Sequence, residues 1–159
     1  GESVTPMASP WLLKSGPPLK QPTDVLGHTL IEAADAYTPH LEWLTWRRWL
    51  DTHGMARAQP KRWLSFNYAY QMTQAALSGQ GIVLARPPLV AESLARGELV
   101  EVFPHTRLHS PMAYWLLLAP RSAQRPEVKA FADWLSAQAV ATREVTGEGV
   151  DSDLVNDLD

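Results

Sequence analysis

The sequence predicts an α/β domain, a doubly wound layer in which helices cover both faces of a sheet. Strands and helices alternate along residues 61–103, which is the order that builds such a layer. Residues 82–85 are apolar at every position, as expected for a strand buried on both faces. Gly81 stands just before this strand and Pro87-Pro88 just after it, so both of its ends carry turn-forming residues.

Two strands are expected before the first long helix. Residues 4–8 form the first strand, which runs into a turn or hinge at Ser9-Pro10. A surface loop rich in glycine and proline follows at 14–22, and residues 28–31 resume as a strand. The chain therefore opens as strand, loop and strand.

A helix is expected at residues 42–53. Trp43, Trp46 and Leu50 recur at helical spacing on one face, and Gly54 is a natural stop. We interpret this tryptophan stripe as part of the core rather than as a cofactor site.

The central stretch supplies two turns that lead from a strand into a helix. A strand at 61–66 is followed by Asn67, which is placed to cap the next helix. Small residues on that helix allow close packing on the sheet, and the buried strand 82–85 follows it. Pro88 then lies in the first turn of a helix that ends near Arg96, before a strand at 99–103.

The last third of the chain is expected to hold a polar loop at 104–111, a long strand at 112–119 and a helix from Pro126 to about Ala141. Residues 144–159 contain six acidic residues and no lysine or arginine. They offer few apolar groups to offset the entropy of ordering, so we predict a solvated, disordered tail.

Composition excludes several classes of protein. The chain has no cysteine, so it can form no disulfide, thiolate zinc site or cysteine nucleophile, in keeping with the cytoplasmic location that we expect. No apolar run approaches the roughly 18 residues of a membrane-spanning helix, and the first ten residues lack the features of a secretory signal. Lysine and arginine are not clustered as in a nucleic-acid-binding surface.

The turns at Phe66-Asn67 and Arg86-Pro87 form the candidate ligand site, because doubly wound sheets bind ligands at the carboxyl ends of their strands. Unpaired amides and the positive end of the helix dipole favour an anion beside Asn67. The Arg86 guanidinium can bind a carboxylate through two parallel hydrogen bonds. The alternatives are a simple helix cap for Asn67, and a solvated strand end or a structural ion pair for Arg86.

The sequence gives less support to an aromatic ligand contact, a metal site or an enzyme active site. Tyr114 and Trp115 must point to opposite faces of the predicted strand 112–119, so one of them can contact a ligand, although burial of both is the favoured interpretation. His105 and His109 have no third ligand nearby, so no metal site is expected. The sequence has no G-x-S-x-G elbow and no P-loop, and we expect neither enzyme activity nor a cofactor.

A set of short motifs follows one another along the chain from about Ser3 to Leu135. They are an S-P-x-L-L turn at 9–13, the residues Leu19, Pro22, Asp24, Leu26, His28, Thr29, Leu30 and Ile31, a W..WL...G helix at 46–54, the signature A-A..G.GIVLAR..LV…L..GELV..F at 75–103, Tyr114-Trp115-Leu116, and Val128, Phe131 and Trp134-Leu135 in the last helix. This set resembles the effector-sensing domain of LysR-type transcriptional regulators. It is most similar to the branch with the glycine-cleavage activator and the β-lactamase regulator.

The resemblance implies a type II periplasmic-binding-protein-like fold, present mainly as its second Rossmann-like lobe with a mixed sheet flanked by helices. It divides the chain into a crossover strand from a first lobe (1–8), the second regulatory subdomain (9–113), the return crossover strand with the C-terminal helix (114–143), and the acidic tail (144–159). The implied effector contacts are Ser65, Phe66 and Asn67 at one turn, Arg86 at the other, and Met7, Ala8 and Tyr114 at the crossover.

The resemblance also implies partners. A small effector, anionic or amino-acid-like, would bind between two lobes and control a homo-oligomer, and DNA would be bound only through an N-terminal winged helix-turn-helix outside this chain. Because most of the first lobe is missing, we expect weak or no effector binding by these residues alone, and we expect another copy of the chain to cover Phe131 and Trp134. The competing hypothesis is an exported solute-binding protein of an uptake system; a signal peptide upstream, in place of a helix-turn-helix, would identify it.

Overall fold

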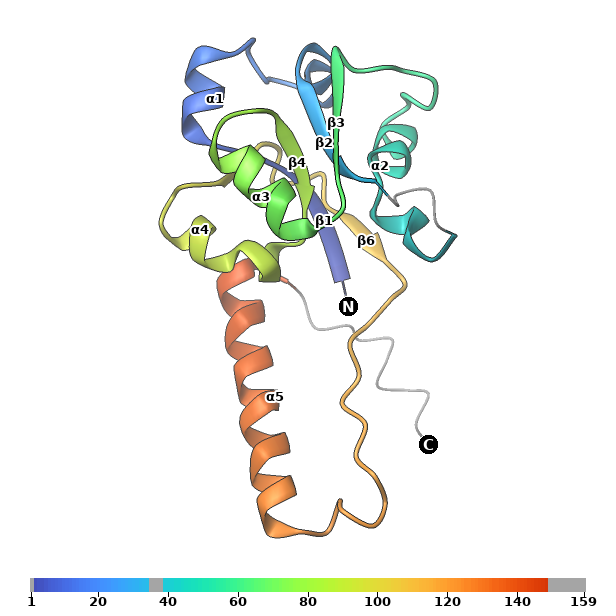
Figure 1. The fold of residues 1–159 in the computed structure, drawn as a ribbon, viewed down its shortest axis with the longest axis vertical. Helices are drawn as coiled ribbons and strands as arrows, with labels where there is room; N and C mark the ends of the chain where they lie inside the picture. Colours follow the sequence, from blue (N-terminus) through green and yellow to red (C-terminus); the bar gives the residue numbers. More distant parts are fainter. Residues whose placement is uncertain (1, 35–38, 149–159) are drawn as a thin grey trace.

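The computed structural model describes residues 2–34 and 39–148, which form a mixed sheet with helices on both faces and one long projecting helix (Figure 1). The strands are β1 (Glu2–Ala8), β2 (Thr29–Ala33), β3 (Arg62–Phe66), β4 (Ile82–Ala85), β5 (Val100–Glu101) and β6 (Leu108–Ser110). The α-helices are α1 (Pro10–Ser15), α2 (Trp46–Thr52), α3 (Ala69–Leu77), α4 (Ala91–Ala95) and α5 (Pro126–Thr146). Short 3-10 helices are η1 (Pro22–Gly27), η2 (Pro39–Leu44) and η3 (Pro87–Val90).

The strand order is β3-β2-β4-β1-β5, with β6 paired to β1. β2 lies between β3 and β4 and runs parallel to both, so that Leu30 is opposite Trp63 on one side and Ile82 on the other. β1 is antiparallel to β4, β5 and β6. The predicted α/β layer is therefore confirmed, and its sheet is mixed.

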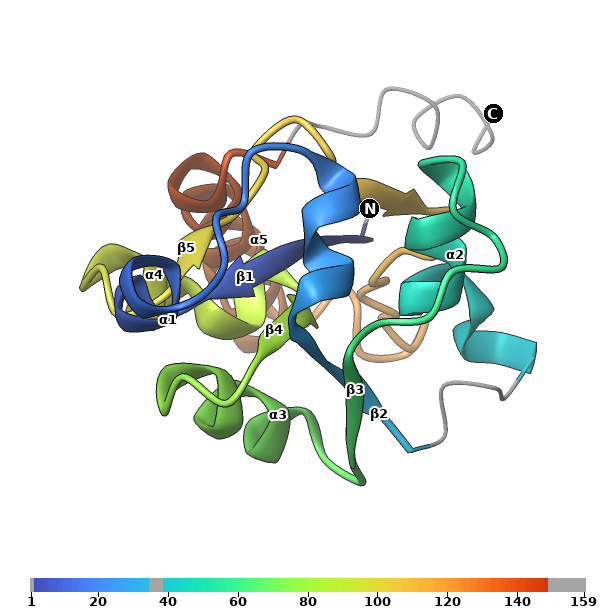
Figure 2. The ribbon, with the colours of Figure 1, turned by 90° about the horizontal axis from the view of Figure 1, so that it is seen from above.

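Hydrophobic residues pack on both faces of this sheet. Leu30 and Ile82 face a cluster that contains the tryptophans of α2. Ile31 and Val83 point the other way, toward α3 and α4. In Figure 2, α2 and α3 accordingly lie on opposite sides of β2. Every residue of β4 is buried, as its continuous apolar run predicted.

The predicted single helix at 42–53 is wrong, because the chain breaks at Thr45 into η2 and α2. The Thr45 hydroxyl accepts a hydrogen bond from the Arg48 amide at 3.1 Å and donates one to the Glu42 carbonyl at 2.9 Å. A threonine that can cap a helix competes in this way with continuation of the preceding turn. Trp46 is buried as predicted, whereas Trp43 is only half-buried.

The strand predicted at 112–119 is also wrong, because those residues have no regular secondary structure. A strand needs a neighbour to pair its amides and carbonyls, and among the described residues none lies beside this segment. Instead β6 forms inside the predicted polar loop and pairs with β1, where Leu108 lies opposite Val4. Exposed apolar side chains follow one another along 114–118.

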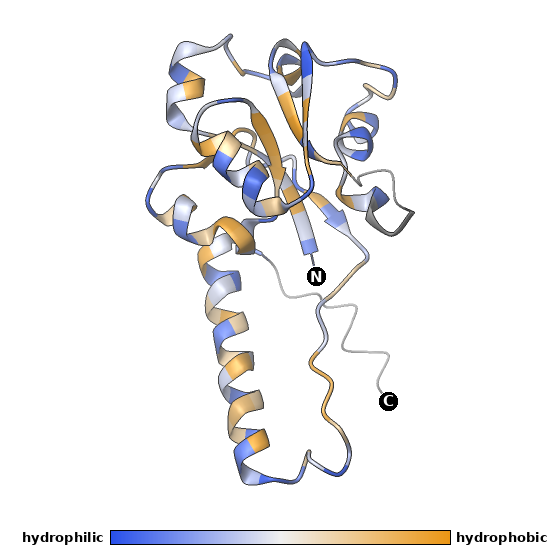
Figure 3. Ribbon diagram, in the orientation of Figure 1, coloured by the Kyte–Doolittle hydropathy of each residue, from blue (hydrophilic) through white to orange (hydrophobic). Residues whose placement is uncertain are grey.

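The last helix, α5, is longer than predicted. It continues to Thr146, where Gly147 ends it in a left-handed conformation (φ 65°), so the first residues of the predicted tail are helical. Its C-terminal end meets η3 and α4, while most of its length projects from the body (Figure 1). Phe131 and Trp134 are more than half exposed and stack on each other with ring centroids 5.8 Å apart, on a helix that is apolar in patches (Figure 3). The predicted disorder of residues 149–159 lies outside the described residues.

None of the helices within 2–34 and 39–148 combines the length with the apolar composition needed to cross a membrane.

Gly81 fixes the approach of β4 to β2. A Cβ atom at this position would lie only 2.5 Å from the Thr29 carbonyl oxygen, which belongs to the backbone and cannot rotate away. We expect Gly81→Ala to lower the free energy of unfolding by about 1–3 kcal/mol, because the two strands must separate. Urea denaturation measures this, with Gln80→Ala at the exposed neighbouring position as control. Equal stability of the two variants would contradict the proposed close approach.

Candidate functional site

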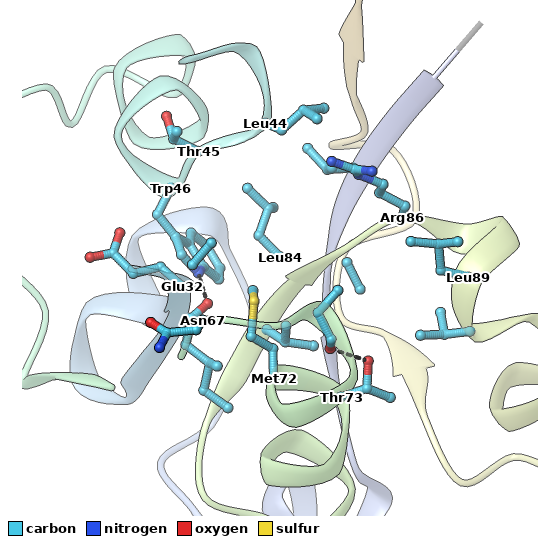
Figure 4. A pocket seen from close by; sticks show the side chains of 17 residues that line it. Glu32, Leu44, Thr45, Trp46, Asn67, Met72, Thr73, Leu84, Arg86 and Leu89 are labelled. Carbon is cyan, nitrogen blue, oxygen red and sulfur yellow. Dashed lines mark hydrogen bonds between the residues drawn. The ribbon is translucent and has the colours of Figure 1, made fainter. Parts of the chain in front are cut away.

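A pocket of about 230 Å³ lies where the parallel strands end (Figure 4). Its walls come from the carboxyl ends of β2 and β4, the first turn of α3, η2 and η3. Its polar side chains are Glu32, Thr45, Asn67, Thr73 and Arg86. The apolar wall includes Ile31, Trp46, Met72, Val83, Leu84 and Leu89.

The order of elements explains why a crevice opens here. β2 leads into η2 and α2 on one face of the sheet, whereas the adjacent β3 leads into α3 on the other face. When two neighbouring strands send their connections to opposite faces, a gap remains between the connections. The pocket lies in this gap, at the carboxyl ends of the parallel strands.

Asn67 lines the pocket without capping α3, contrary to the sequence-based expectation. Tyr68 is the N-cap residue, its backbone is extended, and its side chain makes no capping hydrogen bond. The helix starts one residue later than the cap preference of asparagine suggested. The Asn67 amide therefore remains free of a capping role, at the positive end of a nine-residue helix.

Arg86 directly follows β4 and lines the same pocket. Its Nε atom lies 3.1 Å from the Glu2 carboxylate, which also accepts a hydrogen bond from the Tyr114 hydroxyl at 3.0 Å. The Glu2 side chain is almost fully buried, whereas about a third of the Arg86 side chain remains exposed. Desolvation of the Tyr114 hydroxyl and its contact with the Glu2 carboxylate raise the pKa of Tyr114, although most of its ring is exposed. Arg86 thus joins the pocket to the start of β1.

Glu32 is the acidic residue of the pocket. It is half-buried at the end of β2, and this burial raises the pKa of its carboxyl group. A carboxyl whose pKa is raised by folding destabilises the folded state at every pH where it is ionised. That penalty disappears as the pH falls through the ordinary glutamate value of 4.5.

We therefore expect Glu32→Gln to melt at a higher temperature than the unmodified chain at neutral pH. The gain should shrink as the pH is lowered toward that of a protonated glutamate, because both side chains are then uncharged. Thermal melts across a pH series measure the difference, and a gain independent of pH would exclude this electrostatic origin.

Trp46 closes the pocket on the side of α2. Its Nε1 atom donates a hydrogen bond to the Ile31 carbonyl at 2.8 Å, and its ring is fully buried edge-on against Trp49. The end of β2 is thereby fixed to α2, which holds Glu32 in place.

The structure brings only some of the predicted site residues together. Asn67 and Arg86 share the pocket. Ser65 and Phe66 precede it on β3: Ser65 is exposed and opposite Glu32, and Phe66 packs beside the α3 cluster. Tyr114 lines a separate hollow, which also contains Arg86.

Met7 and Ala8 are completely buried. β1 has neighbours on both sides, which places these two residues in the core rather than at a ligand surface. In this structure they do not line the pocket, so they are not available for direct contact with a ligand there.

Sequence reasoning missed Glu32, Thr45 and Thr73 in the pocket and Glu2 beside it. The signal for Glu32 was present, since an acidic residue directly follows the apolar pair Leu30-Ile31 at a strand end. The predicted strand stopped at Ile31, so Glu32 lay one residue beyond it.

A mixed α/β sheet with a pocket of apolar and a few polar side chains at the ends of its parallel strands is typical of a small-molecule binding domain. The family model described as LysR substrate binding domain matches residues 2–140. The chain therefore belongs to this family, the effector-binding domains of LysR-type regulators, with the type II periplasmic-binding-protein-like fold that the motifs predicted.

The curated relatives are transcriptional regulators. The glycine cleavage system transcriptional activator of Escherichia coli is 32% identical over 143 residues, which is 90% of this chain and 44% of that protein. The Haemophilus influenzae homologue of this activator is 30% identical over 139 residues. The chain thus spans less than half the length of these relatives.

Solved structures of regulator domains have the same fold. The effector domain of the transcriptional regulator AmpR of Pseudomonas aeruginosa is 27% identical with a TM-score of 0.64, over 90% of this chain and 65% of that one. The regulatory domain of AphB in Vibrio vulnificus, at 20% identity and a TM-score of 0.58 over 87% of this chain and 66% of that one, shares the fold.

Proposed function

We propose that the chain senses a small carboxylate, which binds in the pocket between Asn67 and Arg86 and controls a transcriptional regulator. The observation that carries this proposal is the shared pocket: a guanidinium and the first turn of α3 both line it. A guanidinium can hold a carboxylate through two hydrogen bonds, and the amino end of a helix favours negative charge.

Glu2 links ligand binding at Arg86 to the contact between the start of β1 and the segment that carries Tyr114. A ligand carboxylate that binds Arg86 competes with the Glu2 carboxylate, which also holds the Tyr114 hydroxyl. Binding would therefore loosen the contact between the start of β1 and the segment that carries Tyr114. These are the two crossover segments by which residues 9–113 would connect to a first lobe in the proposed two-lobed protein.

The partners follow from the family. We propose that the complete protein is a cytoplasmic homo-oligomer that binds DNA through a winged helix-turn-helix outside these residues. The regulator is favoured over an uptake protein because the relatives that match are transcriptional regulators. We also propose that a second copy covers the exposed rings of Phe131 and Trp134.

The second-copy proposal predicts self-association that depends on these rings. Light scattering over a concentration series should show dimers or larger species, and replacing both Phe131 and Trp134 by Ser should shift the population toward monomer, because the apolar area available for burial is lost. Trp11→Ser, at an exposed tryptophan outside α5, is the control. A monomer at all concentrations would contradict the proposal.

A thermal-shift screen of small carboxylic acids against their amides, at equal ionic strength, tests the pocket itself. At millimolar concentration at least one acid should raise the melting temperature while its amide does not, since only the acid carries the charge that Arg86 recognises. Ala69→Trp, at the exposed start of α3 in the pocket wall, should block the effect by filling the site. Gln74→Trp, exposed on the same helix outside that wall, should not. Stabilisation that survives Ala69→Trp would place the acid elsewhere.

A further inference from the structure

We propose that Glu32 is a second charged contact in the pocket, and that it selects ligands that carry a positively charged amino group as well as a carboxylate. This inference rests on the proposed function, because it assigns the carboxylate to Arg86. It adds a residue that determines specificity and it narrows the ligand class from carboxylates to amino-carboxylic acids.

The sheet places the two charges on one face. Ile31 is opposite Val83 in the parallel pairing of β2 and β4. Side chains alternate along a strand, so Glu32, Leu84 and Arg86 project to the same side of the sheet. Figure 4 shows Glu32 beside Asn67 on one side of Leu84, and Arg86 on the other side.

The separation suits a single small ligand. With strands about 4.8 Å apart and a rise of about 3.3 Å per residue, the Cα atoms of Glu32 and Arg86 are roughly 8 Å apart. A ligand held by both side chains must carry its two charges a few bonds apart, with Leu84 beneath it. Amino acids have this form, and a pocket of about 230 Å³ admits a molecule of that size.

The Glu32 carboxylate lacks a positively charged partner among the described residues. Among the described residues no hydrogen bond or ion pair satisfies its carboxylate, whereas Glu2, Glu92, Glu101 and Glu127 each meet an arginine. A half-buried carboxylate without a partner has an electrostatic cost. An ammonium group from the ligand removes that cost, and a second carboxylate in its place would add to it. The pocket should therefore disfavour dicarboxylates.

The test is an NMR titration of the 159-residue chain that follows the backbone amides of Glu32, Asn67 and Arg86. Glycine, β-alanine and γ-aminobutyrate are compared with acetate, propionate and butyrate at constant ionic strength, and succinate serves as the dicarboxylate. At least one amino acid should bind about tenfold more tightly than its matched carboxylate, because one charge-assisted hydrogen bond is gained.

In Glu32→Gln this ratio should fall to about one, and succinate should bind more tightly than to the unmodified chain, while the plain carboxylates change by less than about twofold. Glu98→Gln, at an exposed position outside the pocket, should retain the full preference. Equal binding of the two series, or a preference that persists in Glu32→Gln, overturns the assignment of Glu32 and leaves the Arg86 site standing. Binding by this chain alone is expected to be weak, so each probe is titrated to high millimolar concentration, where even a weak site is populated. If none of the probes shifts these amides at that concentration, the proposed function fails together with this inference.

Discussion

Replacing Trp46 by Ala should lower the free energy of unfolding by about 3–5 kcal/mol, the range for removing a large buried aromatic side chain. Trp46 is 1% exposed and lies edge-on to Trp49, with ring centroids 5.4 Å apart. Its loss leaves a cavity between α2 and the sheet and removes the indole hydrogen bond to the Ile31 carbonyl. Because small domains are stable by only about 5–15 kcal/mol, a change of this size approaches the whole stability of the fold.

Urea denaturation of a short series of tryptophan variants separates the contribution of apolar packing from that of the indole hydrogen bond. Trp46→Phe keeps most of the apolar volume but loses the indole donor, so about 0.5–1.5 kcal/mol of the effect should remain as the cost of losing the hydrogen bond to the Ile31 carbonyl. Trp115→Ala, at a tryptophan that is 59% exposed, should change stability by no more than about 0.5 kcal/mol. A Trp46→Ala variant as stable as the Trp115→Ala variant would show that α2 is not anchored through this side chain.

Replacing Arg86 by Ala should weaken binding of any acid found in the screen by about 10- to 100-fold, because the charged hydrogen bonds of a guanidinium to a carboxylate contribute about 1.5–3 kcal/mol. Arg86→Lys keeps the charge but loses the two parallel hydrogen bonds, so its affinity for the acid should lie between those of the unmodified chain and Arg86→Ala. Glu2→Gln should strengthen binding, since the ligand no longer competes with an ionised carboxylate for the guanidinium. Isothermal titration calorimetry measures all three.

The control for this series is Arg96→Ala, which removes an exposed arginine that pairs with Glu92 on the surface. It tests whether a change in net charge is sufficient to weaken binding. The affinities of Arg86→Ala and Arg96→Ala should differ by at least about tenfold. If they are equal, the effect is a general electrostatic one and Arg86 is not a contact.

Much of the layer was predictable because local patterns and tertiary packing agree there. The continuous apolar run of β4, the glycine before it and the prolines after it place the strand within a residue. Asn67 and Arg86 could be assigned to one pocket from sequence because both follow parallel strands, whose carboxyl ends share an edge of the sheet.

The failures arose where long-range contacts decide the outcome. Residues 112–119 have the apolar content of a strand, but a strand requires a partner, and pairing is not written in the segment itself. Met7 and Ala8 could not be recognised as core before β1 was known to be flanked on both sides. Glu32 and Glu2 lie far from Arg86 in sequence, and only the sheet register brings them to it.

A crystal structure of the chain with the tightest-binding acid of the screen tests the central claim most directly. The account predicts the carboxylate within hydrogen-bond distance of the Arg86 guanidinium, beside Asn67 and the first turn of α3, with Glu2 displaced from at least one contact. An acid bound on a different surface, with the Arg86–Glu2 pair intact and the pocket between β2 and β4 empty, would contradict it.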